Sequence, residues 1–143
     1  MRQLVLKRGK YLFFFILILF TNPSCDEIDS QIPEVPVRLT INLNIINELT
    51  IPGNSVLFEN YGFGGIIVYC ELPGSYYAYD AACTNEINQT CSIVNEGVLG
   101  TCSCCESKFI LSGSAYPSEG PASAPLKQYN VSILGNNMLR VYN

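Results

Sequence analysis

Residues 37–44 read Val37-Arg38-Leu39-Thr40-Ile41-Asn42-Leu43-Asn44, in which apolar and polar side chains alternate without a break. Successive side chains of an extended strand point to opposite faces of a sheet, so this period of two predicts a strand buried on one side. Short β-rich runs, separated by turn residues at 73–74 and 135–137, predict further strands over residues 65–70, 76–80, 108–111, 126–134 and 138–142. No segment has a helical period or repeats, so we expect one antiparallel all-β domain.

The N-terminus has the order of a secretory signal. An apolar run over residues 11–20 follows four basic residues, Arg2, Lys7, Arg8 and Lys10, and the polar stretch 21–24 then leads into Cys25. The run is shorter than the roughly 20 apolar residues of a membrane span. We therefore expect a signal peptide over residues 1–24 and lipidation of Cys25, which would make the chain an outer-membrane lipoprotein of the cell envelope, facing the periplasm or the cell surface. An ordinary secretory signal and an uncleaved anchor are the alternatives.

Residues 25–36 are polar, acidic and proline-containing, without strand or helix periodicity. This composition predicts a tether between the lipid anchor and a domain over residues 37–143. The acidic pair Asp26-Glu27 directly after Cys25 is similar to the surface-export signal of outer-membrane lipoproteins in some diderm bacteria. A solvated linker without such a signal is the alternative.

The charge balance excludes nucleic acid as a partner. Four of the eight basic residues precede Cys25 and all 12 acidic residues follow it, so the mature chain would carry a charge of about −8 and repel phosphate backbones. The chain has no histidine, which excludes conventional Ser-His-Asp and Cys-His sites, and the glycine run 62–65 lacks the phosphate-loop form. We expect no catalytic activity of its own, and solvated surface positions for the carboxylates near the cysteines, Asp80, Glu86, Glu96 and Glu106.

The cysteines are clustered rather than spread as a disulfide framework would spread them. Five of the six that follow Cys25 lie between residues 83 and 105: Cys83, Cys91, Cys102, Cys104 and Cys105. Residues 102–105 contain a C-x-x-C pair, whose thiolates can bind one metal ion, and a second pair from another loop would complete a tetrahedral zinc site or a four-cysteine [2Fe-2S] site. In the oxidising envelope the alternative is disulfides, such as Cys102 with Cys105 or Cys91 with Cys104.

At this point the sequence resembles the Rieske ferredoxin-like domains, over residues 65–142. Residues 65–69 and 77–84, which end Ala82-Cys83-Thr84, look like the family's strand, hairpin and first ligand loop, usually Cys-Thr-His. Residues 102–109, Cys-Ser-Cys-Cys-Glu-Ser-Lys-Phe, look like the second ligand loop, usually Cys-Pro-x-His-Gly-Ser-x-Phe. Gly120-Pro121-Ala122, followed by Pro125-Leu126, matches the loop that covers the cluster. The resemblance implies a Rieske-like antiparallel β-sandwich with a loop-built metal or cluster subdomain.

The departures from the family concern the ligands themselves. Asn85 and Cys105 stand where the two histidines are usual, and Glu106 replaces the glycine after the second. Since asparagine is a poor iron ligand, the implied metal ligands are Cys83, Cys91, Cys102 and Cys105. With iron, this all-cysteine site would be a low-potential one-electron carrier. With zinc it would be a redox-silent clamp between two loops.

Cys104 leaves a second set of pairings open. Some members of the family have a disulfide at this place between the two ligand loops, so the resemblance implies a bond from Cys104 to Cys91, which would leave too few ligands. A bond between Cys70 and Cys104 would instead restore an even count of cysteines. Two functions follow. One is a membrane-anchored metal-binding or electron-transfer domain that serves a redox partner protein. The other is a cofactor-free or zinc- or disulfide-stabilised fold that acts as a structural or binding module of the envelope.

Overall fold

A computed structural model describes residues 31–143, so the predicted signal and Cys25 lie outside the described residues. The elements in this range are β1 (Arg38–Asn42), the 3-10 helix η1 (Asn47–Thr50), β2 (Ser55–Phe58), β3 (Ile66–Leu72), β4 (Ser75–Asp80), β5 (Ile93–Glu96), β6 (Leu99–Cys102), β7 (Lys108–Ile110), β8 (Pro117–Glu119), β9 (Gln128–Leu134) and β10 (Met138–Tyr142). No helix in residues 31–143 is long and apolar enough to cross a membrane.

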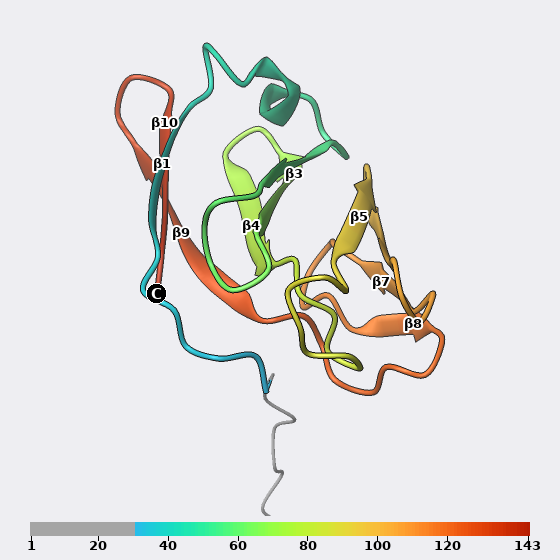
Figure 1. Cartoon of the computed structure of the whole chain (residues 1–143). Coiled ribbons are helices and arrows are strands. Elements are labelled where there is room, and N and C mark those ends of the chain that lie inside the picture. The colour runs from blue at the N-terminus through green and yellow to red at the C-terminus, as the bar shows by residue number, and fades with distance from the viewer. Residues whose placement is uncertain (1–30) are drawn as a thin grey trace, which may run out of the picture.

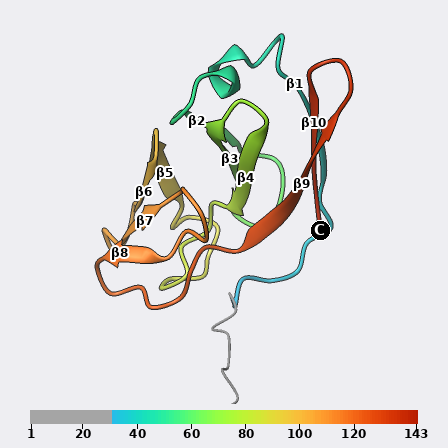
Figure 2. The same cartoon turned by 180° about the vertical axis from the view of Figure 1, so that it is seen from behind.

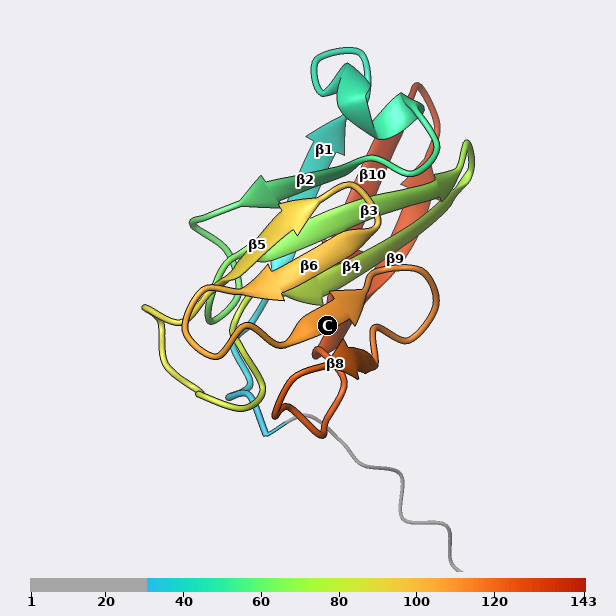
Figure 3. The ribbon, with the colours of Figure 1, turned by 90° about the vertical axis from the view of Figure 1, so that its right-hand side faces the viewer.

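The strands form two antiparallel sheets. The larger sheet has six strands in the order β1-β10-β9-β4-β3-β2, and it curls so that β1 and β10 stand apart from β3 and β4 (Figures 1 and 2). The smaller sheet has four strands in the order β5-β6-β7-β8 and lies over the β3–β4 part of the larger one (Figure 3). The predicted all-β antiparallel sandwich with a separate subdomain is confirmed.

Strand β3 divides the core into two parts. Ile66 and Val68 pack toward β1 and β10, where Leu39, Ile41, Leu139 and Val141 are buried. Ile67 and Tyr69 point the other way, toward Ile93 of β5, Cys102 of β6 and Phe109 of β7. Because β3 is covered on both faces, its sequence is a continuous apolar run rather than an alternating one.

The expected strands at 37–44, 65–70, 76–80, 108–111, 126–134 and 138–142 are present within a few residues of their predicted limits. The sequence patterns missed β2, β5, β6 and β8, which have three or four residues each. A strand of this length contains at most two repeats of the apolar–polar alternation. In addition, β8 begins with a proline, which signals a loop.

The part of the predicted tether that the structure describes, residues 31–36, is docked rather than free. Ile32 is buried, and Glu34 forms an ion pair with Lys127 at 2.9 Å. The side chain of Asn143 donates to the backbone oxygen of Val35 at 3.0 Å. The predicted tether therefore contacts the domain at these residues, because Asn143 and the loop before β9 supply partners that the local sequence does not show.

Asp80, at the end of β4, is fully buried, which corrects its expected place on the surface. Its carboxylate accepts hydrogen bonds from the backbone N–H groups of Phe63, Gly64 and Ala82 and from the hydroxyl of Tyr129, at 2.7–2.9 Å. The glycine-rich segment 62–65 thus binds this carboxylate through its backbone N–H groups. Asp80 fixes the point where the chain leaves the larger sheet for the cysteine-bearing loops.

Candidate metal-binding site

Three cysteines that are free in the structure converge between the two sheets. Cys83 follows β4, Cys102 ends β6, and Cys105 lies in the turn after β6. Their sulfur atoms all lie within 4.8 Å of one another, and the Cys83 and Cys105 sulfurs are 3.5 Å apart. Cys83 and Cys102 are buried, while Cys105 is half-buried and gives the group its opening to solvent. We call Cys83, Cys102 and Cys105 the thiol triad.

The second ligand loop is a tight turn that presents two members of the triad. The backbone N–H of Glu106 donates to the Cys102 carbonyl at 3.1 Å, and the Cys102 N–H donates to the Ser107 carbonyl at 2.8 Å. Glu106 has a φ of 58°, in the left-handed region that favours glycine, which is the residue usual here in the resembled family. The motif at residues 102–109 therefore predicted this turn, whereas Glu106, which is not a typical residue for a positive φ, did not.

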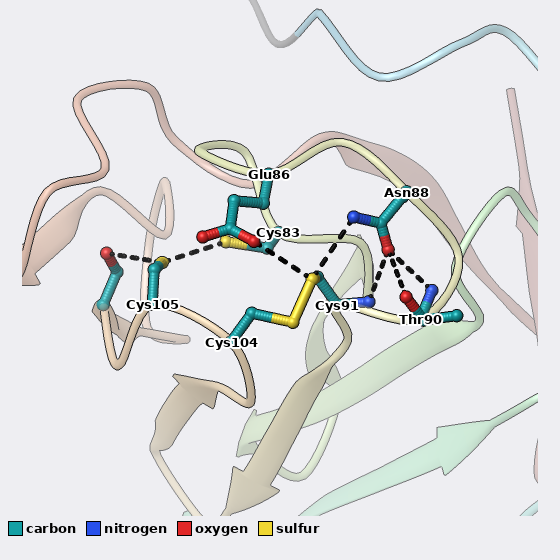
Figure 4. Close-up of a disulfide and its surroundings, with 8 residues drawn as sticks. Cys83, Glu86, Asn88, Thr90, Cys91, Cys104 and Cys105 are labelled. Carbon is teal, nitrogen blue, oxygen red and sulfur yellow. Dashed lines mark hydrogen bonds between the residues drawn. A yellow bond between two sulfur atoms is a disulfide. The ribbon is translucent and has the colours of Figure 1, made fainter.

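The first ligand loop is closed by a disulfide. Cys91 is bonded to Cys104, with their Cα atoms 5.3 Å apart (Figure 4). The Cys83 N–H donates to the Cys91 carbonyl at 3.0 Å. The side chain of Asn88 shapes the same loop by accepting from the N–H groups of Thr90 and Cys91. The bond joins the two ligand loops.

This disulfide corrects the expected ligand set of Cys83, Cys91, Cys102 and Cys105. A disulfide sulfur has no thiolate form, so Cys91 is not available as a ligand in this structure. The alternative bond between Cys70 and Cys104 is absent, since Cys70 is free and buried on β3. The spacing of the cysteines could not distinguish these outcomes, because Cys91 is close enough in sequence to the other cysteines to be either a metal ligand or the disulfide partner of Cys104.

Ser107 connects the triad to the expected cluster-covering loop, Gly120-Pro121-Ala122. The Ala122 N–H donates to the Ser107 hydroxyl oxygen at 3.0 Å, which leaves the hydroxyl hydrogen free for the Cys105 sulfur, 3.2 Å away. A Cβ atom on Gly120 would lie 2.5 Å from the Cα of Ser107, so this loop packs directly on the second ligand loop. Fully buried Ser107 is a site residue that the sequence analysis did not single out.

Two members of the triad have shifted pKa values in opposite directions. Burial, and then the neighbouring Cys102 thiol, raises the pKa of Cys83 to about 12, although the backbone N–H groups of Asn85 and Glu86 act against it. Burial also acts to raise the pKa of Cys105, but hydrogen bonds from the side chain and backbone of Ser107, then from Cys102 and Cys83, outweigh it and leave this pKa below its usual value. Cys105 therefore becomes a thiolate, the form that binds metals, before Cys83 does.

The remaining polar candidates near the triad do not join it. Asn85, at the position of the first usual histidine, is exposed, as is Glu106. The Glu86 carboxylate lies 3.3 Å from the Cys91 sulfur, but a disulfide sulfur has no proton to donate, so this is a contact and not a hydrogen bond. Asp80 is occupied by its four donors.

The geometry of the triad fits one metal ion better than a cluster. Neighbouring sulfurs of a tetrahedral zinc thiolate site, with Zn–S bonds of about 2.3 Å, lie about 3.8 Å apart. The 3.5 Å between Cys83 and Cys105 is close to this separation. A [2Fe-2S] cluster held by cysteines alone needs four thiolates, and residues 31–143 bring only three free thiols together.

Comparisons with known proteins agree on the fold. No protein-family model matches the chain, and no curated protein matches it. Among solved structures, a complex of reduced oxygenase and oxidized ferredoxin in carbazole 1,9a-dioxygenase aligns with a TM-score of 0.52 and 19% identity, over 74% of this chain and 93% of that chain. The ferredoxin of carbazole 1,9a-dioxygenase from Nocardioides aromaticivorans IC177 aligns with a TM-score of 0.48 and 20% identity, over 76% of this chain and 98% of that chain.

A putative NADH-dependent nitrite reductase small subunit from Mycobacterium tuberculosis also aligns, with a TM-score of 0.44 and 13% identity, over 77% of this chain and 97% of that chain. At these identities the likeness concerns the fold and not the ligands, in which this chain differs by its lack of histidine. The two-sheet arrangement, the order of the two ligand loops and the alignment with a TM-score of 0.52 lead to the same conclusion. The chain has an all-β fold of the Rieske ferredoxin-like type.

Proposed function

We propose that this chain is a metal-binding module of the cell envelope that holds one metal ion through the thiolates of Cys83, Cys102 and Cys105. The observation that carries the proposal is the convergence of three free sulfurs while the two other cysteines of the loops are bonded to each other. Thiolate ligands favour soft or borderline ions such as Zn²⁺. The disulfide and the Ser107 contact would hold the two loops in place for such an ion.

The number of free thiols favours a metal over a further disulfide. A bond between Cys83 and Cys105, the pair 3.5 Å apart, would leave Cys102 alone and buried. A metal ion uses all three sulfurs at once. It also binds them as thiolates and so protects them from oxidation in the envelope.

Electron transfer is the second candidate function, and the fold similarity to a ferredoxin that forms a complex with an oxygenase favours it. It would require iron at the triad and a partner protein that exchanges electrons with it. The thiol count gives this candidate less support, because a four-cysteine cluster needs one more ligand than the described residues offer. Measuring iron and sulfide separates it from the single-ion proposal.

The test is metal and acid-labile sulfide analysis of the full chain, produced in a bacterial host and purified from the cell fraction that contains it. About one zinc or similar ion per chain, lost in Cys102→Ser but kept in Cys70→Ser, is the expected result. About two iron and two sulfide per chain, with a reversible visible spectrum, would establish the electron-transfer candidate instead. No metal, together with oxidised Cys83 and Cys105 in mass spectrometry, would reject both and leave a disulfide-stabilised module.

The location is part of the same proposal and rests on residues 1–25. We propose that lipidation of Cys25 anchors the domain to the envelope. Labelling cells with a fatty-acid analogue should mark the wild-type chain and not Cys25→Ser, whereas Cys70→Ser, a change at another cysteine, should be marked as wild type is. Equal labelling of wild type and Cys25→Ser, or none in either, would reject the lipid anchor.

A further inference from the structure

The thiol triad leaves one coordination position open. Zinc in proteins takes four ligands in a tetrahedral arrangement, of which the triad supplies three. Water or another protein group must supply the fourth. Within residues 31–143 one further group of adjacent metal-ligand side chains exists, and it consists of Glu86, Cys91 and Cys104.

In this second group Glu86 is the one side chain with a free ligand atom. Cys91 and Cys104 are bonded to each other and have no thiolate form. The Glu86 carboxylate is exposed, but it is turned toward the disulfide, with an oxygen 3.3 Å from the Cys91 sulfur (Figure 4). Among the described residues it has no cation partner, and it receives no hydrogen bond from this proton-free sulfur. Its position beside the sulfurs is therefore not explained by any bond it makes there.

Glu86 is connected to two members of the triad through the chain. It follows Cys83 by three residues in the first ligand loop. Its carboxylate lies within 4.8 Å of the Cys104 sulfur, and Cys104 is followed directly by Cys105. A glutamate side chain has three rotatable bonds, so its carboxylate can change position without a movement of the backbone, and binding an ion at the triad would use such a change.

The neighbouring candidates are less suitable. Asn85 has a neutral amide, which binds zinc more weakly than a carboxylate does, and its side chain is exposed. Glu106 is also exposed and belongs to neither group of adjacent ligand atoms. Glu86 alone combines a carboxylate with a position beside the sulfurs.

We propose that Glu86 is the fourth ligand of the metal ion held by the thiol triad, which it binds through a carboxylate oxygen. This inference rests on the proposed metal-binding function and adds a coordination set of three sulfurs and one oxygen. With Glu86 bound, the ion has no open position, so the site is a closed, structural type rather than one that binds an external ligand. Glu86 would also link the first ligand loop to the metal a second time, three residues after Cys83.

The test compares wild type, Glu86→Gln and Glu96→Gln, a matched change at another exposed glutamate, each loaded with Co²⁺ under anaerobic conditions with the disulfide intact. Visible absorption reports the coordination of Co²⁺, and imidazole serves as an external ligand, since the chain has no histidine. We expect wild type and Glu96→Gln to keep their spectra when imidazole is added. Glu86→Gln should bind imidazole with a spectral change and hold Zn²⁺ on the order of 10-fold more weakly or worse.

The outcomes separate the two proposals. If all three proteins bind metal and respond to imidazole alike, Glu86 is not a ligand, while the thiolate site stands. If Cys102→Ser retains the sulfur-to-cobalt charge-transfer band of wild type, or wild type binds no Co²⁺ or Zn²⁺, the triad is not a metal site and both proposals are rejected. Circular dichroism and a count of free thiols check that each variant is folded and keeps the Cys91–Cys104 bond.

Discussion

The two sheets of this domain are stabilised in different ways. The larger one places long aliphatic side chains of β1, β3 and β10 against each other, and its strands β3 and β9 have seven residues each. The smaller one has strands of three or four residues, and sulfur atoms of Cys83, Cys91 and Cys102 form part of its core. The two parts also differ in their covalent links, because among residues 31–143 the disulfide Cys91–Cys104 lies in the loops of the smaller subdomain.

The largest expected effect falls at the junction of the two regions. Asp80→Ala removes the acceptor of four buried donors and should lower the free energy of unfolding by about 3–5 kcal/mol, because unpaired buried donors lose their hydration without compensation. Urea unfolding monitored by circular dichroism measures it. Exposed Glu59→Gln is the control and should have no measurable effect. A loss below 1 kcal/mol for Asp80→Ala would show that the two regions do not depend on this carboxylate.

Loss of the disulfide should come next and should act on one region only. The bond closes a loop with a sequence separation of 13, and its removal in the double variant Cys91→Ala/Cys104→Ala should cost about 3 kcal/mol. Amide hydrogen exchange should quicken in residues 83–107 and stay unchanged in β1 and β10. Equal acceleration in both sheets would mean that the domain unfolds as one unit and would remove the contrast.

Removal of the metal tests whether an ion at the thiol triad stabilises the smaller subdomain. At a free metal concentration 100 times the dissociation constant, binding stabilises the fold by about 2.7 kcal/mol, and a chelator should abolish this. A chelator should therefore lower the Tm of the metal-loaded wild type. It should not change the Tm of Cys105→Ser, which lacks one thiol of the triad. A chelator effect of the same size in Cys105→Ser would place the metal elsewhere.

Ser107→Ala should have a smaller effect on stability and a clear one on the site. It leaves the Ala122 N–H without its acceptor and removes the Ser107 hydroxyl from the donors to Cys105, at a cost of about 1–2 kcal/mol. Metal affinity should fall as well, because the Cys105 thiolate loses a hydrogen bond that favours it. Exposed Ser118→Ala is the matched control. If the metal affinity of Ser107→Ala equals that of wild type, the contact between Ser107 and Cys105 does not support the site.

The smallest effect is expected at the docked segment 31–36. Hydrogen bonds from Lys127 and Asn143 lower the pKa of Glu34, so its contribution to docking is complete at neutral pH and is lost as the pH falls through this lowered value. Glu34→Gln should therefore quicken hydrogen exchange at the Val37 N–H at pH 7, without a measurable change in global stability. Wild type and variant should converge in acid. The same exchange rate in both proteins at pH 7 would mean that the ion pair does not hold the segment.

The sequence predicted the parts of this fold whose signals are local. The alternation at 37–44 fixes which side chains of β1 face the core, and the turn residues at 135–137 fix the hairpin of β9 and β10. The ordered motifs at 77–84, 102–109 and 120–122 predicted which loops would meet. Three of the four expected ligands, Cys83, Cys102 and Cys105, do converge.

The pairing of sulfurs could not be predicted in this way, because it depends on distances between loops that are far apart in the chain. The sequence left Cys91 open as a metal ligand or as the disulfide partner of Cys104, and only the approach of the loops after β4 and β6 joins it to Cys104. The burial of Asp80 and the ion pair between Glu34 and Lys127 have the same origin. Each needs a partner from a segment that is many residues away.

The sequence by itself determined six of the ten strands of residues 31–143, the all-β class and the cysteine-bearing loops, since periodicity and turn chemistry act over a few neighbouring residues. Only the tertiary structure decided which sulfurs are bonded, which are free, and which carboxylate lies beside them. Those outcomes follow from the packing of the smaller sheet on β3 and β4, which brings residues 80–91 and 102–107 together. Side-chain chemistry supplies the candidates for a site, and the distances set by packing select among them.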